Sequence, residues 1–461
     1  MKIVISGASG FVGAQLIRAL AGGPHQIIAL SRSPVRDLPQ NATWRETDLF
    51  SAQSTLEALR DADVALYLVH SMMPSTRLFQ GDFHDTDLLL ADNFARACSE
   101  NGVKRIVYLG GLVPTGHISR HLESRHEVGD VLRSTGIPVT ELRAGMIVGP
   151  GGSSFEILKS LVERLPVMIL PEWTQRRTQA VFLDDIIRVI AASIDDSRFS
   201  GRIIDVVNGE SLTYETLLRQ MAETLGLRRR MLPVPIRSTE FSKRWVTLFG
   251  SATYELVSPL IDSLLCDLPS SDPDPLIRDL ILHPSFRSMA REALVRPRAP
   301  ETTRAPRRRQ HENSVRSIQR LPATATRDCH WISTEYMSFL PALFRTWIRV
   351  EADASSGRVR FRFAPLPTPL LELQYVETRA KEHRRKFHIV GGMLTQTTTT
   401  GWLEFRQVEG RRYTLACIHE FRPSLPWFVY RLTQAPLHRW VMYRFGKHLA
   451  RMASAEVTRG Q

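Results

Sequence analysis

The sequence predicts two domains of different class. The first is an α/β domain with a doubly wound parallel sheet, and the second is an α+β domain with an antiparallel sheet and a long C-terminal helix. Three observations support this. An apolar run at the start ends in a glycine-rich turn, apolar runs then alternate with amphipathic stretches, and strand patterns follow one another beyond a basic segment. A chain of 461 residues, 43% hydrophobic, suffices for two or three globular domains.

The chain begins MKIVISGASGFVG, which combines a strand, a tight turn and the start of a helix. This geometry places backbone N–H groups and a helix N-terminus against a dinucleotide pyrophosphate, so it predicts a Rossmann-type sheet. The spacing is GxxGxxG rather than the commoner GxGxxG, and a purely structural turn is the alternative interpretation. The first candidate cofactor-binding residues are Gly7, Ala8, Ser9, Gly10, Phe11, Val12 and Gly13.

The second apolar run, Gln26 to Leu30, predicts which nicotinamide cofactor is bound. An acidic residue at its end would bind a ribose 2′-hydroxyl, but the chain has Ser31, Arg32 and Ser33 there. These residues suit a 2′-phosphate. We therefore expect NADP(H) in preference to NAD(H), with a solvated surface role for Arg32 as the alternative.

The remaining strands of the first sheet are expected near Thr43 to Trp44, and at Val64 to Val69, Arg105 to Leu109 and Val139 to Leu142. The carboxyl ends of parallel strands meet at one edge of a sheet, where ligands bind. The residues that follow these strands are therefore further cofactor-binding candidates: Asp48, Leu49, Val69, His70, Ser71, Leu109, Gly110, Ala144, Gly145 and Met146.

The succession GASGFVG, Asp48-Leu49, IVYLGG and ELRAGMIVG resembles the short-chain dehydrogenase/reductase superfamily, in its extended or atypical branch, over about residues 1 to 230. The segment from His121 to Trp173 is similar to NmrA-like and complex-I 39-kDa-subunit-like members. The resemblance implies NAD(P) binding. It also implies a catalytic Tyr with a Lys four residues on, but His121 and Arg125 occupy those places.

His121 and Arg125 are the candidate catalytic residues, and two interpretations of them stand. In the first, His121, with an ordinary pKa of about 6.5, is the acid beside a carbonyl while Arg125 holds the ribose or the substrate. In the second, the segment is an exposed helix start in which Glu123, Arg125 and Glu127 exchange surface charges, and Arg125 at most contacts the cofactor.

Beyond the sixth strand, GPGGSSFE predicts either a substrate-side wall or an ordinary turn, with Ser153 or Ser154 capping the next helix. Asp184 and Asp185 are expected near a helix start, where carboxylates favour the positive helix end. No metal site is predicted. The four cysteines lie far apart without a CxxC pair, which also argues against a disulfide framework.

The net charge of +13 is concentrated in part between Arg296 and Arg327, a segment rich in Arg and Pro. This composition predicts a solvated linker, with a nucleic-acid arm or contact with an anionic membrane as alternatives. We expect no specific nucleic-acid partner. The first strand begins within three residues of Met1 and no apolar run reaches spanning length, so the expected compartment is the cytoplasm.

The expected domains are 1–230 for the Rossmann domain, 231–295 for a helical cover on the substrate side, 296–328 for the linker and 329–461 for the last domain. In the last domain, strand patterns run from Arg358 to Phe421 and a helix from Leu425 to Met452. This arrangement resembles START-like helix-grip domains, which hold apolar ligands between sheet and helix. A filled core is the alternative.

Three functional hypotheses follow. The first is an NADP(H)-dependent oxidoreductase acting on an apolar carbonyl or hydroxyl compound, and the second is a catalytically silent NADP(H)-binding sensor or assembly factor. The third is a carrier of a lipid or other hydrophobic ligand. The intact glycine turn favours the first two hypotheses, whereas the missing Tyr and Lys favour the second.

Overall fold

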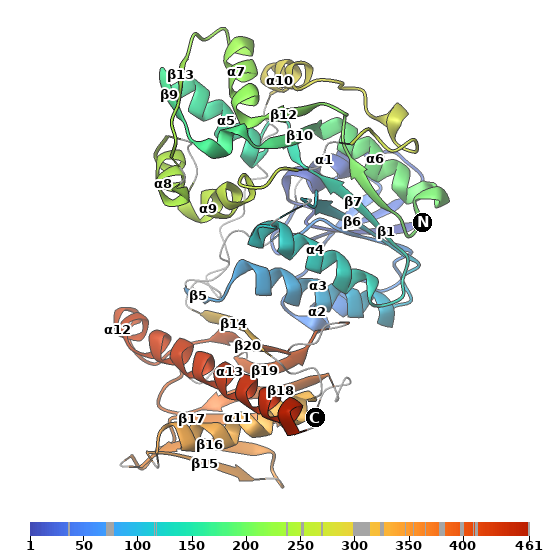
Figure 1. Cartoon of the computed structure of the whole chain (residues 1–461). Coiled ribbons are helices and arrows are strands. Elements are labelled where there is room, and N and C mark those ends of the chain that lie inside the picture. Colours follow the sequence, from blue (N-terminus) through green and yellow to red (C-terminus); the bar gives the residue numbers. More distant parts are fainter. Residues whose placement is uncertain are drawn as a thin grey trace. The chain divides into compact units, whose positions relative to one another are not determined.

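The computed structural model describes all residues except 36, 71–77, 115, 117, 237, 250–252, 269–270, 298–313, 323–326, 346, 354, 365, 378–382, 397–400, 409, 411–413 and 460–461. The chain forms two compact units, coloured along the sequence in Figure 1. Unit 1 comprises residues 1–73 and 90–305, and unit 2 comprises residues 74–89 and 306–461.

The centre of unit 1 is a seven-stranded sheet in which every neighbouring pair is parallel, with the order β11-β7-β6-β4-β1-β2-β3. The chain moves outward from β1 first to one side and then to the other, so the predicted doubly wound sheet is confirmed. Its strands are β1 (Lys2–Ser6), β2 (Gln26–Ser31), β3 (Ala42–Glu46), β4 (Val64–Tyr67), β6 (Arg105–Gly111), β7 (Val139–Ala144) and β11 (Ile203–Val206).

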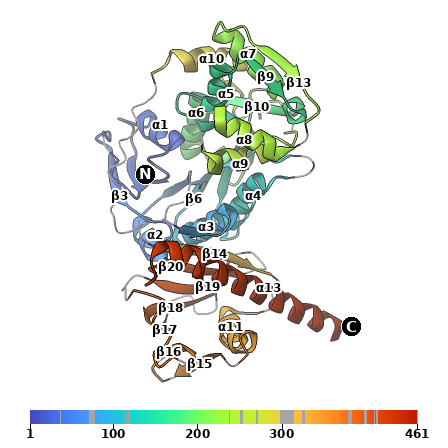
Figure 2. The ribbon, with the colours of Figure 1, turned by 90° about the vertical axis from the view of Figure 1, so that its left-hand side faces the viewer.

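Helices cover both faces of this sheet, which is why its strands are continuous apolar runs. Leu16 of α1 and Ile186 of α6 share a buried core with Ile3, Ile5 and the other strands. Figures 1 and 2 show α3 and α4 on the opposite side of the sheet from α1 and α6. The helices are α1 (Phe11–Ala19), α2 (Ala52–Ala58), α3 (Phe83–Glu100), α4 (Arg120–Arg133) and α6 (Leu183–Asp195).

A second core of unit 1 joins the segment after β7 to the expected helical cover. Phe155, Leu217, Val257 and Phe286 belong to the same buried cluster, so residues 231–295 pack with the Rossmann part of the chain. The short strands form the sheets β12-β10-β8 and β13-β9. The elements here are β8 (Met146–Val148), α5 (Ser153–Arg164), β9 (Val167–Leu170), β10 (Arg177–Phe182), β12 (Ser211–Thr213), α7 (Tyr214–Thr224), β13 (Arg230–Pro233), α8 (Thr239–Phe249), α9 (Tyr254–Ser263) and α10 (Phe286–Val295), with 3-10 turns at Glu172–Gln175, Ser197–Phe199 and Arg278–Leu280.

Unit 2 is an eight-stranded sheet, antiparallel except at one edge, with two long helices packed on it. Tyr336 of α11 and Phe445 of α13 meet Phe405 of the sheet in one buried cluster. Figure 2 shows α13 crossing the strands. The elements are β5 (Leu78–Gln80), β14 (Val315–Leu321), α11 (Cys329–Leu343), β15 (Ile348–Asp353), β16 (Arg358–Phe363), β17 (Leu371–Val376), β18 (Arg384–Gly391), β19 (Trp402–Gln407), β20 (Thr414–Phe421), α12 (Trp427–Leu432) and α13 (Gln434–Arg459).

The boundaries of unit 2 differ from those expected from the sequence. Strand β14 lies inside the expected linker 296–328, and β5, which comes from between β4 and α3, pairs with β14 as a parallel edge strand. The side chain of Gln80 holds this strand, because its amide donates to the Ala435 carbonyl at 2.8 Å and its oxygen meets His438 Nδ1 at 3.3 Å. The strand pattern of β14 was overlooked because it directly follows a stretch that is rich in Arg and Pro.

Candidate cofactor and active site

The glycine turn after β1 has a geometry that only glycine fits at two positions. Gly7 has φ +77°, and a Cβ there would lie 2.7 Å from the Leu68 carbonyl oxygen. A Cβ on Gly13 would collide with the Gly7 carbonyl oxygen. The Gly10 amide donates to that same oxygen at 2.9 Å, which closes the turn. Glycine at these positions thus allows a tight turn and close packing of α1 and the end of β4 against it, which fits the turn of a dinucleotide-binding fold.

The turn leads directly into α1, whose N-cap is Gly10 without a side-chain cap. The first backbone amides of a helix have no hydrogen-bond partner inside the helix. The amides of Phe11, Val12 and Gly13 are therefore suited to bind an anion. The Phe11 ring lies against the GPGG segment, where a Cβ on Gly152 would be 3.0 Å from its Cζ. The expected Ser153 or Ser154 cap is wrong: α5 begins at Ser153 with Gly152 as N-cap and has no side-chain cap.

The residues after β2 lie beside β3, which neighbours β2 in the sheet. The Ser31 hydroxyl accepts a hydrogen bond from Trp44 Nε1 at 3.0 Å and donates one to the Ser33 carbonyl, so it fixes the local backbone. Arg32 is exposed at this carboxyl end. The segment itself therefore presents a cation where the ribose of a dinucleotide is recognised, and Glu46 of β3 lies opposite Ser31.

Asp48 and Leu49 follow β3 in a turn that α3 holds in place. The Asp48 carboxylate accepts from the Phe50 amide at 3.2 Å, and the Asn93 side chain donates to the carbonyl oxygens of Leu49 and Phe50 at 2.7 and 3.2 Å. Leu49 is buried. Asn93 is a positioning residue that the sequence did not reveal, since a lone Asn on an amphipathic helix has no distinctive pattern.

Three of the candidate residues come together at the ends of β4 and β6. Arg125 of α4 extends between two imidazoles: its Nη1 lies 2.7 Å from His70 Nε2, and its Nε donates to His121 Nε2 at 3.4 Å. Gly111 lies beneath it, because a Cβ there would be 2.9 Å from Arg125 Cδ. The Tyr108 hydroxyl donates to the Arg125 carbonyl at 2.8 Å and anchors the helix to β6.

The guanidinium fixes the protonation of both histidines. Burial first, and then the charge of Arg125, lowers the pKa of His121 from 6.5 to about 3. The pKa of His70 is also well below 6.5, owing to burial and then to Arg125 and His121. Arginine only donates hydrogen bonds, so each Nε2 accepts and the proton of each neutral ring is on Nδ1. The positive charge of this cluster is therefore on Arg125 at neutral pH.

This arrangement changes what His121 contributes chemically. At pH 7 only about one side chain in ten thousand is an imidazolium when the pKa is about 3. His121 is also 7% exposed rather than part of a solvated helix start. Arg125, which keeps its proton at all physiological pH values, is the group that can stabilise a developing oxyanion.

The remaining candidates lie at the same edge of the sheet. Val69 and His70 follow β4, Leu109 and Gly110 lie in the last residues of β6, and Ala144 is the last residue of β7. These three strands are parallel neighbours, so their carboxyl ends lie side by side. Gly145 separates β7 from β8, and a side chain there would collide with the Gln179 carbonyl of β10. Met146 is buried. Ser71 lies outside the described residues.

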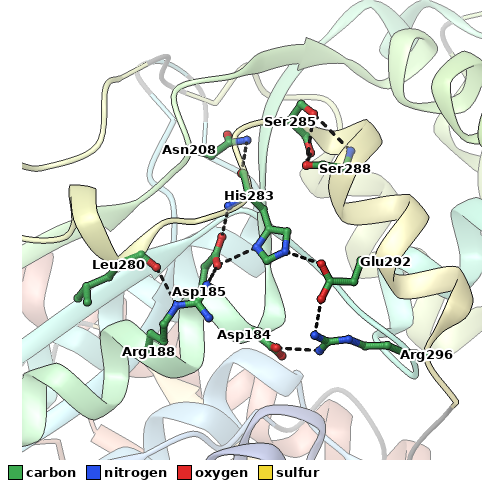
Figure 3. Close-up of polar contacts among 10 residues, drawn as sticks. All are labelled: Asp184, Asp185, Arg188, Asn208, Leu280, His283, Ser285, Ser288, Glu292 and Arg296. Atoms are coloured by element: carbon green, nitrogen blue, oxygen red, sulfur yellow. Dashed lines mark hydrogen bonds and ion pairs between the residues drawn. The ribbon is translucent and has the colours of Figure 1, made fainter.

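Asp184 and Asp185 do lie in the first turn of α6, but they belong to a charged network drawn in Figure 3. Asp185, with no exposed side-chain surface, pairs with Arg188 and accepts from both the amide and Nδ1 of His283, at 3.2 and 2.9 Å. His283 Nε2 meets Glu292 of α10 at 2.7 Å. Burial alone would lower the pKa of His283, but the hydrogen bonds to Asp185 and Glu292 raise it.

The rest of the network continues from α10 back to α6. Arg296 joins Asp184 at 2.7 Å and also pairs with Glu292, while its guanidinium lies 5.2 Å from the centre of the Phe182 ring. The acidic and basic side chains of this network pair with one another within unit 1. The network therefore holds α10 against α6. The sequence did not reveal this network because His283 lies in an irregular segment about a hundred residues from its partner.

Comparisons with known proteins agree with this fold. Residues 7–162 match the protein family described as NAD(P)H-binding. The auxiliary protein GraX of Staphylococcus aureus is 27% identical over 112 residues, which cover 24% of this chain and 36% of GraX. The 2-alkyl-3-oxoalkanoate reductase of Stenotrophomonas maltophilia is 28% identical over 109 residues, 23% of this chain and 32% of that protein. The chain thus spans about a third of the length of these relatives.

Among solved structures, the triphenylmethane reductase of Citrobacter sp., crystallised with NADP(H), superposes with a TM-score of 0.50. It is 20% identical, and the match covers 64% of this chain and all of that enzyme. No described helix of the present chain is both long and apolar enough to cross a membrane. The first unit therefore has a Rossmann fold, and its residues 7–162 are similar to the NAD(P)H-binding family.

Proposed function

We propose that the protein is an NADP(H)-dependent oxidoreductase that acts on an apolar carbonyl or hydroxyl compound. The observation that carries this proposal is the position of Arg125 and its two neutral imidazoles at the sheet edge that the glycine turn also borders. The glycine turn and a permanently charged group thus share one carboxyl edge, which is where a bound dinucleotide and a developing negative charge on a substrate would lie.

The preference for NADP(H) is supported by the end of β2. Arg32 is exposed there between two serines, and a planar guanidinium suits a phosphate dianion. Ser31 is held by Trp44 and Ser33, which orders the backbone that would meet the phosphate. The Citrobacter enzyme of the same fold was crystallised with NADP(H).

The proposed chemistry assigns roles to residues of this chain only. The bound cofactor would supply or accept hydride. Arg125 would stabilise the negative charge on the substrate oxygen, while the acceptor nitrogens of His70 and His121 fix the guanidinium in one orientation. Because neither ring is an imidazolium at neutral pH, the proton for that oxygen would come from water.

The same observation favours the second candidate, a catalytically silent NADP(H)-binding sensor or assembly factor. Such a protein needs the glycine turn but no proton donor, and the two histidines with lowered pKa values provide none at neutral pH. The two candidates share cofactor binding and differ in turnover.

Calorimetry with NADPH and NADH tests the shared part. We expect tighter binding of NADPH by tenfold or more, and loss of this preference in Arg32→Glu, whose carboxylate repels the 2′-phosphate. Arg18→Glu, an exposed arginine on α1, is the matched control and should keep the preference. Absence of heat with either cofactor would refute both candidates, and tighter binding of NADH would refute the preference.

Nicotinamide absorbance with a panel of apolar aldehydes, ketones and alcohols separates the two candidates. The oxidoreductase proposal expects turnover that falls at least a hundredfold in Arg125→Met, a typical loss for one electrostatic contact to an oxyanion, and much less in His121→Gln. Cofactor binding without turnover on any panel member would instead support the sensor. Equal loss in His121→Gln would return the role of acid to His121.

A further inference from the structure

The last two helices of unit 2 expose an unusual number of large apolar side chains. Phe428 and Leu432 of α12 are 69% and 71% exposed, and Leu437, Trp440 and Tyr443 of α13 are 43% to 58% exposed. The opposite side of α13 is the one that packs on the sheet, through Val441, Met442, Phe445 and Leu449. The helix thus has two apolar sides, and packing on the sheet uses only one of them.

The exposed side is also strongly basic. Arg431, Arg439, Arg444, Lys447 and Arg451 are exposed, and the sequence has no Asp or Glu from residue 421 to residue 455. Two of these cations lie over aromatic rings: Lys447 Nζ is 4.6 Å from the ring centre of Tyr443, and the Arg444 guanidinium is 5.8 Å from that of Trp440. The described part of the two helices therefore carries rings, aliphatic groups and cations but no carboxylate of its own, and Glu335 of α11 pairs with His448 at 2.7 Å.

Neighbouring loops of unit 2 enlarge this surface at two places. Near the start of α12, the Ser424 amide donates to the Leu394 carbonyl at 3.1 Å, which brings Met393, 47% exposed, beside Leu425. On α13, the Trp440 ring meets that of Phe344 at 6.1 Å, just before the turn that carries Trp347, which is 57% exposed. We call the exposed residues of α12 and α13, with these additions, the helical face.

We propose that the helical face is a docking surface for an anionic lipid bilayer. Tyr and Trp rings favour the headgroup level of a membrane, apolar side chains enter just below it, and Arg and Lys meet lipid phosphates. A nucleic acid would use the cations and the rings but offers nothing to Leu432 or Leu437. The contact lies at the surface of the bilayer, since no described helix can span it.

Vesicle co-sedimentation of the full chain tests this proposal. We expect binding to vesicles of phosphatidylcholine with one-third phosphatidylglycerol, weaker binding as salt is raised, and little binding to pure phosphatidylcholine. The triple variant R439Q/R444Q/K447Q should bind about a hundredfold more weakly, because each cation near an anionic surface contributes several-fold. The apolar variant L432S/W440S should also bind more weakly while keeping the salt dependence.

The matched control is R60Q/R228Q/R230Q, which removes the same charge from exposed arginines of unit 1 and should bind within twofold of the unchanged protein. Cofactor calorimetry and circular dichroism confirm that each variant is folded. Equal binding to both vesicle types, or an equal loss in the control, would overturn the proposal. It would also be overturned if the chain ignores vesicles and instead forms a dimer that W440S dissociates, since the occupant would then be a second copy.

Discussion

The histidines of two clusters in unit 1 have partners of opposite charge. In the first, His70 and His121 flank the Arg125 guanidinium, and the pKa values of both histidines are lowered. In the second, His283 lies between the carboxylates of Asp185 and Glu292, and its pKa is raised. Both histidines are largely covered, with His121 7% exposed and the side chain of His283 14% exposed, but His121 lies deeper in the protein.

The comparison shows that charged partners can reverse the effect of burial on the charge of a histidine. Burial disfavours the imidazolium in both clusters: it is the largest cause of the lowered pKa of His121, whereas for His283 it opposes a rise that the two carboxylates together produce. A cation beside the ring adds to that cost, whereas two carboxylates outweigh it. The first cluster is therefore suited to present one fixed positive charge at the cofactor edge, and the second to hold two helices together.

The largest effect is expected from Asp185→Ala. Asp185 has no exposed side-chain surface and is the shared partner of Arg188 and His283, so its removal leaves two cations short of a carboxylate. The free energy of unfolding should fall by about 3–5 kcal/mol. Urea denaturation measures it. Asp184→Ala, on the same helical turn but 24% exposed and paired with Arg296, is the matched control and should cost about 1 kcal/mol. Similar losses in both variants would show that Asp185 is not the centre of the network.

Replacing the cation of the first cluster tests the other half of the comparison. Arg125→Met keeps the length of the side chain but leaves two imidazole acceptors without their donor, which should cost about 1–3 kcal/mol. Histidine resonances followed against pH should show the pKa of His121 rising from about 3 toward 6.5. Arg125→Lys retains the charge and should keep the pKa low. An unchanged value in Arg125→Met would mean that burial alone sets it.

Much of unit 1 could be predicted from the sequence because its signals are local. The order strand, glycine turn, helix, together with the alternating apolar runs, fixed the parallel sheet and its carboxyl edge. The described candidates that follow the strands, from Gly7 to Met146, lie at the carboxyl ends of those strands for the same reason. The meeting of His70 with Arg125 was not predictable, since it depends on how α4 packs beside β6 across 55 residues of chain.

Unit 2 was predicted less completely, because two of its features depend on distant pairing. A three-residue strand such as β5 has no periodicity to recognise, and it is stabilised by β14 and by the carbonyl of Ala435 more than 350 residues away. Helix α11 was missed as well: it contains Pro341 and buried aromatic residues on a short stretch whose helical pattern is weak. The strands from β16 to β20 alternate clearly and were found.

Acid should destabilise the protein through the first cluster. The folded-state pKa of His121 is lowered below its unfolded value of 6.5, so the unfolded chain binds more protons as the pH falls. Between pH 6.5 and about pH 3, each pH unit should remove up to about 1.4 kcal/mol per histidine. His121→Gln, which can still accept from Arg125, should flatten this slope in urea denaturation at several pH values. A slope that is the same in the variant would assign the acid sensitivity elsewhere.

The smallest effect is expected at alkaline pH, from the second cluster. The pKa of His283 is raised, so its stabilising contribution is complete below the unfolded value of 6.5 and is lost as the pH rises through the folded value. Glu292, with 38% of its side chain exposed, weakens the pairing through solvent screening, so we expect a loss of about 1 kcal/mol. His283→Gln should abolish the decline above pH 6.5 and leave the acid slope of the first cluster intact. If both slopes vanished in this variant, the two clusters would be energetically coupled, and the opposite signs could no longer be assigned to separate partners.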